Sequence, residues 1–281
     1  MNLDPPLPGP DLNNQLMVLG SRGATPPSRE HGSHYGTHTT CFGIEQEESL
    51  LFIDAGSGLV NARSLLLQPH PQKSIHIFLT HLHLDHLMGL PSFPPLYDPS
   101  YDIHLYGSSE QHGALQDYLR LLVAPPFWPL SIQKMAGSIT LHELSNEVRE
   151  LELGDAIIRW HPIPHSGACL SYRLDFPNRS LCIATDHEPI PELKDSFIDF
   201  ASGVDTLVHD AQYTPIEYSK RRGWGHATWE IAAEIADRTN ADQLLLTHHD
   251  VERTDQEIDS MVIQARNLFP NTYAAREGRR Y

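Results

Sequence analysis

The sequence is poor in cysteine and has no long apolar run. Its three cysteines, Cys41, Cys169 and Cys182, are an odd number without a C-x-x-C spacing. Neither a disulfide framework nor a thiolate zinc site is therefore indicated. No stretch of about 18 apolar residues is present, and the first residues lack the basic and apolar regions of a signal peptide. We expect a soluble, cytoplasmic protein with reduced cysteines and no membrane partner.

Basic residues are also few. The chain has 20 Lys and Arg against 36 Asp and Glu, which gives a formal net charge of −16. Such a charge repels polyanions, whereas nucleic-acid-binding proteins usually carry basic patches. Long RNA or DNA is therefore a poor candidate substrate, although bound dications would reverse the local field. The sequence also lacks a G-x-S-x-G elbow and a P-loop, so neither serine-hydrolase nor P-loop nucleotide chemistry is indicated.

The length bounds the number of domains. With 281 residues and 40% apolar content the chain can bury a substantial core, and we predict one domain over residues 15–281. Residues 1–14 contain four prolines and three asparagines and little apolar periodicity. This composition predicts an extended or disordered lead-in.

Short apolar segments ending in polar loops are the main secondary-structure signal. Strands are predicted at 15–19, 40–45, 50–54, 75–80, 103–106, 139–143, 149–153, 156–162, 181–185, 205–209 and 243–247. His165 is expected in a loop between two strands. With helices between some of the strands, this pattern predicts two mixed sheets packed face to face and flanked by helices, an α/β (α+β) arrangement.

Two capping-box patterns predict helix starts. Ser108 with Gln111 opens a segment whose apolar face includes Leu115, Tyr118, Leu119 and Leu122. Thr254 with Glu257 opens the last helix, with an apolar stripe at Ile258, Met261, Val262, Ala265 and Leu268. Further helices are expected at 61–68 and around Ile231, Ala232, Ile235 and Ala236, and residues 274–281 are predicted to form a charged tail.

The most informative stretch is HLHLDH, which runs from His81 to His86 directly after the apolar run 75–80. In an extended chain, positions i and i+2 point to the same face, so His81 and His83 can reach one ion as the strand ends. Asp85 and His86 can then face a second ion beside the first. Imidazole and carboxylate suit zinc, iron or manganese, and two such ions make a hydrolytic site. A histidine-rich surface loop is the alternative, since the chain has 18 histidines.

The motif H-x-H-x-D-H at a strand end resembles that of the metallo-β-lactamase-fold hydrolases. The resemblance implies a four-layer αββα sandwich and a dinuclear centre. His165, Asp186 and His248 follow later strands in the contexts PHSG, ATDHE and LTHHD, and their order is similar to the family's loop histidine, bridging aspartate and final histidine. The resemblance assigns one ion to His81, His83 and His165, the other to Asp85, His86 and His248, and the bridge to Asp186.

Some assignments within this set stay open. His249 is an alternative to His248, because alternation along a strand gives the two opposite faces. His187 is interpreted as a support for a neighbouring ligand. Zinc is the expected metal, with manganese or iron as alternatives, and two dications lower the pKa of a water between them enough to supply a nucleophile near neutral pH.

Two further segments resemble the phosphodiesterase and nuclease branches of the family. These are VHDAQY at 208–213 and GWGHAT at 223–228. The resemblance implies that His226 lies near the scissile phosphate and that Asp210 orients it, and we count Asp85 with them as catalytic. The alternative is that His226 is a capping or packing residue. The loop 20–27 and YGTHTTC resemble that branch's G-S-x-G-S-x-P and Y-G-G-N-T-x-C, with departures at Ala24, Thr37 and His38; a purely structural loop is the alternative.

The expected size of the substrate follows from the short segment between His165 and Asp186. Transfer-RNA-processing members carry a long arm between the positions of His165 and Asp186, where this chain has only 20 residues, 166–185. A small phosphodiester, such as a cyclic nucleotide or a nucleotide ester, is the expected substrate. The alternatives are an acyl hydrolase of lactones, thioesters or β-lactams that uses the same activated water, and a non-catalytic binding module. Residues 123–130, PPFWP with its flanks, are expected to form a lid or a subunit contact, so a homodimer is considered; the alternative is that the segment only fills the core.

Overall fold

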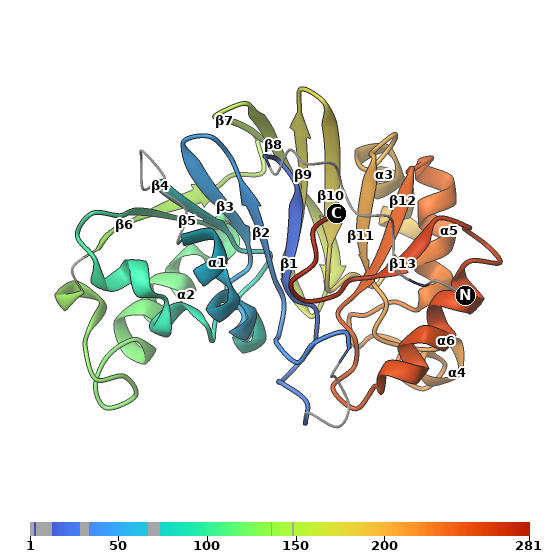
Figure 1. The fold of residues 1–281 in the computed structure, drawn as a ribbon, viewed down its shortest axis with the longest axis horizontal. Coiled ribbons are helices and arrows are strands. Elements are labelled where there is room, and N and C mark those ends of the chain that lie inside the picture. Colours follow the sequence, from blue (N-terminus) through green and yellow to red (C-terminus); the bar gives the residue numbers. More distant parts are fainter. Residues whose placement is uncertain (1–2, 4–12, 29–33, 67–73, 136, 148) are drawn as a thin grey trace.

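The computed structural model describes residues 3, 13–28, 34–66, 74–135, 137–147 and 149–281. Most of the predicted lead-in, residues 1–14, lies outside these ranges. Two sheets stand side by side at the centre of the molecule, with helices on their outer sides (Figure 1). Among the described helices, none is both long and apolar enough to cross a membrane.

The first sheet has six strands. Their spatial order follows the sequence: β1 (Leu16–Gly20), β2 (Cys41–Glu45), β3 (Ser49–Ile53), β4 (Ser74–Phe78), β5 (Asp102–Ser108) and β6 (Ser138–Leu144). The first two pairings are antiparallel and the next three are parallel, so the sheet is mixed.

The second sheet has seven strands. Its order is β13 (Thr272–Ala274), β12 (Gln243–Thr247), β11 (Thr206–Asp210), β10 (Arg179–Ala184), β9 (Gly167–Phe176), β8 (Ala156–His165) and β7 (Glu150–Leu153). β10 to β13 are parallel neighbours, whereas β7 to β10 pair antiparallel.

Three clusters of buried apolar side chains hold the four layers together, one at each interface between layers. The central cluster lies between the sheets and joins side chains such as Phe42 and Phe78 to Tyr172 and Leu245. The outer face of the first sheet is covered by α1 (Arg63–Leu66) and α2 (His112–Asp117). The outer face of the second is covered by α3 (Pro191–Phe200), α5 (Trp229–Thr239) and α6 (Asp255–Ala265), and a short helix α4 spans Pro215–Tyr218. The predicted four-layer αββα sandwich is confirmed.

One predicted helix start is wrong. β5 continues through Ser108, which pairs with Leu144 of β6, so its backbone belongs to the sheet. Its hydroxyl accepts a hydrogen bond from Glu110 instead of capping a helix at Gln111. A 3-10 turn at Ser109–Gln111 follows, then α2, and then a π-helical turn at Tyr118–Leu122. The second capping box, Thr254 with Glu257, is confirmed.

Other element boundaries also differ from the prediction. Ser57–Ala62 is a 3-10 helix that leads into α1, and residues 67–68 of the predicted helix lie outside the described residues. α6 ends at Ala265, so Leu268 is not part of its buried stripe and is 50% exposed. α3 was not predicted, although Pro191 at its first turn is a recognised start signal.

The predicted charged tail is an ordered part of the fold. After β13, the backbone of Arg279 accepts a hydrogen bond from Val18, and Tyr281 exchanges two with Leu16. The tail therefore covers the free edge of β1. Because β13 belongs to the second sheet, these last residues connect the edges of both sheets (Figure 1).

Candidate metal centre

The structure brings all seven predicted ligands to one place, where several strands end. β4 leads to His81, β8 ends at His165, β10 leads to Asp186 and β12 leads to His248. Three groups of side chains have candidate ligand atoms within 4.8 Å of one another: His81, His83, His165 and Asp186; Asp85, His86 and His248; and Asp186, His226 and His248. The first two correspond to the two ligand groups that the sequence predicted, and the third adds His226. His165 is the last residue of β8, not a loop residue as expected, because β8 and β9 are joined by a tight hairpin at Ser166.

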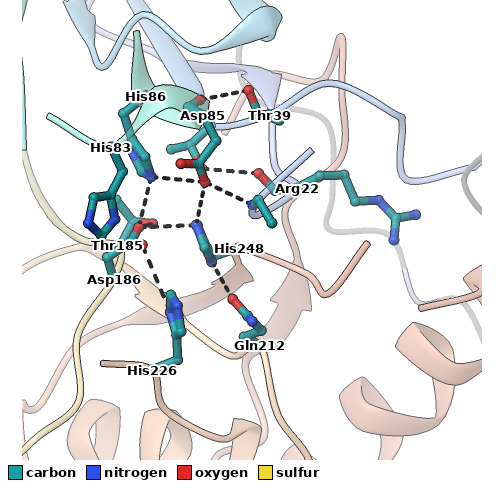
Figure 2. A network of polar contacts seen from close by, with 12 residues as sticks. Arg22, Thr39, His83, Asp85, His86, Thr185, Asp186, Gln212, His226 and His248 are labelled. Atoms are coloured by element: carbon teal, nitrogen blue, oxygen red, sulfur yellow. Dashed lines mark hydrogen bonds and ion pairs between the residues drawn. The ribbon is translucent and has the colours of Figure 1, made fainter. Parts of the chain in front are cut away.

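Asp186 lies between the two groups (Figure 2). Its Oδ1 is 3.6 Å from Nε2 of His165. Its Oδ2 is 3.1 Å from Nε2 of His86 and 3.2 Å from Nε2 of His248. Ligands around one tetrahedral zinc ion, with bonds of about 2.0 Å, lie about 3.3 Å apart. The carboxylate is therefore positioned to bridge two ions.

Backbone strain concentrates at this centre. Asp54, Asp186 and His248 have φ angles of 62°, 56° and 57°, and Ala24 has 60°. Left-handed backbone at residues other than glycine costs about 1–3 kcal/mol and persists where the surrounding structure imposes it. Such strain is typical of functional sites.

Four histidines of the centre each have a hydrogen-bond partner at Nδ1. His86 donates to Asp54 at 2.7 Å and His165 to the Gly225 carbonyl at 2.8 Å. His248 Nδ1 lies 2.9 Å from the Gln212 side-chain oxygen, and His81 Nδ1 lies 3.0 Å from the Thr80 hydroxyl. A partner at Nδ1 fixes the tautomer and directs Nε2 toward the centre, as for metal-binding imidazoles.

The unpaired atoms test whether metal ions fit. The Nε2 atoms of His81, His86 and His248 are buried and have no hydrogen-bond partner. A buried polar atom without a partner costs about 1–3 kcal/mol. A cation between these atoms and the carboxylates would satisfy all of them at once. The residues present therefore fit a pair of divalent ions with nitrogen and oxygen ligands.

The two carboxylates of the centre are ionised, whereas His86 must lose a proton before it can bind a metal: burial lowers its pKa, but Asp186 and Asp54 outweigh burial and raise this pKa well above its ordinary value. Burial raises the pKa of the Asp186 carboxyl, but the neighbouring histidines, led by His248, outweigh burial and hold this pKa well below its ordinary value. Burial is likewise outweighed at Asp85, whose pKa is lowered by His248 and His86. Burial lowers the pKa of His81. Ionised carboxylates and neutral imidazole are the forms that bind metal.

His226 and Asp210 form a pair beside this centre. His226 Nδ1 lies 2.8 Å from Asp210 Oδ2 and 3.9 Å from Asp186 Oδ1. The other Asp210 oxygen accepts hydrogen bonds from the backbone of Gln212 and Ala227, which fixes the carboxylate. Burial lowers the pKa of His226, but Asp210 outweighs it and raises the pKa to about 9. The imidazole is thus held in its protonated form.

Sequence comparison decides the family. Residues 50–249 match the β-lactamase superfamily domain, a span that covers most of the chain. The chain belongs to this superfamily. It has the metallo-β-lactamase fold and is a metal-dependent hydrolase, as its sequence predicted.

The relatives of this superfamily member are distant. Ribonuclease BN of Cronobacter sakazakii is 22% identical over 281 aligned positions, which cover 81% of this chain and 88% of the relative. The metallo-β-lactamase fold protein YhfI of Bacillus subtilis has a TM-score of 0.72 and 18% identity, covering 95% of this chain and 98% of its own. A diphosphatase of the PhnP family has a TM-score of 0.71 and 20% identity, and the match covers 96% of this chain and 97% of the diphosphatase. At these identities the structural likeness shows the fold alone.

Of the two adjacent histidines in LTHHD, only one faces the metal centre. His248, with its positive φ, turns its ring into the centre. His249 is buried behind it, where its ring packs near Tyr35 and its backbone bonds the loop at Ser21 and Gly23. His248 is therefore the one that can serve as a ligand.

The interpretation of His187 needs correction. Its Nδ1 lies 3.0 Å from Nε2 of His209, whose own Nδ1 donates to the Asp210 carbonyl. The ring packs against Phe197 of α3. Because Asp186 faces the centre, its neighbour faces the outer core, and His187 supports His209 instead of a predicted ligand.

The loop 20–25 supports the ligands. Ala24 N donates to Asp85 Oδ2 at 2.8 Å, and a Cβ on Gly23 would lie 2.3 Å from the His248 ring. Arg22 is fully buried and bonds the carbonyls of Gly36 and Arg253. The loop thus holds Asp85 and His248 in place. The sequence had left open whether this loop contacts the substrate or only connects two strands.

Two acidic residues of the site were missed by the sequence analysis. Asp54 accepts from His86 and also from the backbone and hydroxyl of Thr80. Glu188 is buried, and its carboxylate accepts from the backbone of Gly223 and Gly225. Asp54 ends an apolar strand, the same signal that found the ligands. Glu188 follows the strand 181–185 within ATDHE, but its contacts with Gly223 and Gly225 join segments 35 and 37 residues apart and could not be predicted from the sequence.

The segment 123–130 packs outside the first sheet. Trp128 donates from its indole nitrogen to Tyr97 at 2.8 Å and contacts the outer apolar cluster. Phe127 is 70% exposed. Whether this segment acts as a lid or as a subunit contact stays a prediction.

Proposed function

We propose that the chain is a dinuclear-metal phosphodiesterase that cleaves a small phosphodiester, such as a cyclic nucleotide or a nucleotide ester. The observation that carries this proposal is the His226–Asp210 pair, 2.8 Å apart and adjacent to Asp186. Loss of an alkoxide from phosphorus requires a proton donor, whereas acyl transfer in this fold does not call for such a pair. The names of two similar proteins, a ribonuclease and a diphosphatase, support chemistry at phosphorus.

The ligands would be His81, His83 and His165 for one ion and Asp85, His86 and His248 for the other, with Asp186 shared. When bound, the two dications supply a nucleophilic water near neutral pH and neutralise charge on the phosphate. We favour zinc, because histidine predominates among the ligands, with manganese or iron as alternatives.

His226 would act as the general acid. Its Nδ1 is engaged by Asp210, so Nε2 is the nitrogen left to donate a proton to the departing oxygen. Asp210 keeps the imidazole protonated, and its own orientation is fixed by two backbone N–H groups. Gln212 links this pair to the metal centre. Its side chain bonds His248 (Figure 2), and its backbone bonds Asp210.

A small substrate is favoured by the chain between His165 and Asp186. β9 and β10 fill most of it, with one tight turn before β9 and a second between β9 and β10, so the structure has no arm there to hold a transfer RNA. The net charge of −16 also disfavours long polyanions. A cytoplasmic location and a homodimeric state remain part of the proposal on sequence grounds.

A substrate panel tests the proposal. Metal-loaded protein is offered cyclic nucleotides, a nucleoside 5′-(p-nitrophenyl phosphate), a lactone, a thioester and a β-lactam. Hydrolysis of phosphodiesters at rates well above the acyl substrates is expected. Turnover of acyl substrates with none of any phosphodiester would overturn the assignment in favour of the acyl hydrolase.

A further inference from the structure

We propose that Trp224 and Arg221 form a binding site for the planar base of a nucleotide substrate, at the edge of the metal centre. This inference rests on the proposed phosphodiesterase function and adds the chemical class of the group beyond the scissile phosphate. The two residues belong to the turn that joins α4 to His226.

Trp224 presents a large aromatic ring to solvent. Its side chain is 61% exposed, and it is two residues before His226. An exposed indole at this position is available to stack on a planar ligand.

The backbone on both sides of Trp224 is held by one buried carboxylate. The buried carboxylate of Glu188 accepts hydrogen bonds from Gly223 N at 2.8 Å and Gly225 N at 2.7 Å, on both sides of Trp224. Gly225 has a φ of +91°, and a Cβ there would lie 2.2 Å from Nδ1 of His165. The backbone on which Trp224 stands is thus fixed to a predicted metal ligand.

Arg221 extends the site toward the general acid. Its guanidinium lies 4.9 Å from the centre of the Tyr213 ring and 5.8 Å from that of Trp224. The Tyr213 ring in turn meets the His226 ring edge-on, with centroids 5.7 Å apart. A continuous row of rings and one guanidinium therefore leads from the proposed proton donor to the exposed indole.

Basic residues gather at this turn, and one of them, Arg221, also pairs with Asp250, whose Oδ2 lies 3.5 Å from its Nη1. Lys220, Arg221 and Arg222 are consecutive in a chain that has 36 acidic and only 20 basic residues. Arginine binds phosphate and stacks on planar groups, and tryptophan stacks on bases with little dependence on sequence. A nucleobase with its phosphate offers both features, whereas an alkyl phosphodiester offers only the charge.

Two esters with one leaving group test the site. The KM of a nucleoside 5′-(p-nitrophenyl phosphate) is compared with that of methyl p-nitrophenyl phosphate. Because stacking on an aromatic ring corresponds to roughly 5- to 150-fold per base, the wild type should favour the nucleoside ester by a factor of that size. Trp224→Ala and Arg221→Met should lower this ratio toward one, and Trp224→Phe should keep most of it. Ile263→Ala, which removes an exposed apolar side chain on α6, should leave the ratio as in the wild type.

The outcomes separate this inference from the function on which it rests. A wild type that cleaves both esters with equal KM, or a ratio that Trp224→Ala does not change, overturns the base site. If Trp224→Ala changes only the sedimentation of the protein and not the KM ratio, the base site is also overturned, and the surface is assigned to a protein contact. If neither ester is cleaved, the proposed function fails. The base site is then judged by quenching of protein fluorescence: adenosine 5′-monophosphate should quench the wild type but not Trp224→Ala, and quenching equal to that by ribose 5-phosphate overturns it.

Discussion

His226 Nδ1 lies 2.8 Å from Oδ2 of Asp210, a carboxylate whose other oxygen is fixed by two backbone N–H groups. The relationship joins the end of β11 to the turn before α5. It gives a histidine near the metal centre a raised pKa, about 9, despite burial that lowers it. A strong, oriented proton donor is the function that this pair suits.

The first prediction concerns that donor. Loss of a general acid costs roughly 10²- to 10⁴-fold in rate, so His226→Ala should lower kcat by about that factor on an ester with a poor leaving group. On a nitrophenyl phosphodiester, whose leaving group needs little protonation, the loss should be much smaller. Metal content is verified in both proteins, since a collapsed site would mimic the effect. Equal losses on the two substrates would remove the acid role from His226.

The second prediction concerns Asp54, which holds His86. Removal of a carboxylate that orients a metal-binding histidine typically costs about 10- to 100-fold in metal affinity. Asp54→Ala should weaken zinc binding by a factor in that range, measured by competition with a chromophoric chelator. The control is Asp117→Ala, which removes an exposed aspartate paired with Arg120. Unchanged affinity in Asp54→Ala would show that His86 does not depend on this contact.

Much of the site could be predicted because its signals are local. The HLHLDH motif and the polar residues at the ends of apolar strands identify the ligands without any knowledge of strand order. Asp54 could not be assigned, because its contact with His86 depends on β3 and β4 being parallel neighbours. The preference for His248 over His249 depends on a left-handed backbone angle. At Ser108, pairing with β6 overrode a local capping pattern, which is why that helix start was wrong.

The third prediction concerns Gly23. A Cβ at this position would lie 2.3 Å from Cε1 and 2.5 Å from Nδ1 of His248. Gly23→Ala should therefore displace the ring, break its bond to Gln212 and reduce both metal content and activity. Gly113→Ala is the matched control, because a Cβ at that position meets nothing within 4 Å. Full metal content in Gly23→Ala would mean that the loop 20–25 adapts without cost.

The fourth prediction is the effect of acid on stability. His76 on β4 hydrogen-bonds with Ser74 and Tyr106, and burial, together with His104 and His142, lowers its pKa from 6.5 to about 4. Between pH 6.5 and 4, His76 is therefore protonated in the unfolded chain but neutral in the folded protein. The free energy of unfolding is highest above pH 6.5 and decreases as the pH falls toward 4.

His76→Phe removes this titration. The fall in the free energy of unfolding between pH 6.5 and 4, measured by urea unfolding, should be smaller in the variant by on the order of 3 kcal/mol. His34→Phe, which replaces an exposed histidine, should retain the wild-type dependence. An acid dependence in His76→Phe equal to that of the wild type would contradict the assignment.

The number of metal ions tests the account most directly. Protein stripped of metal is dialysed against buffered zinc, and bound zinc per chain is measured by mass spectrometry together with hydrolysis of a nucleoside 5′-(p-nitrophenyl phosphate). We predict two ions per chain in the wild type, with activity that requires both, and no more than one tightly bound ion with little activity in Asp186→Ala. At most one tightly bound ion in the wild type, unchanged by Asp186→Ala, would contradict a dinuclear centre bridged by Asp186.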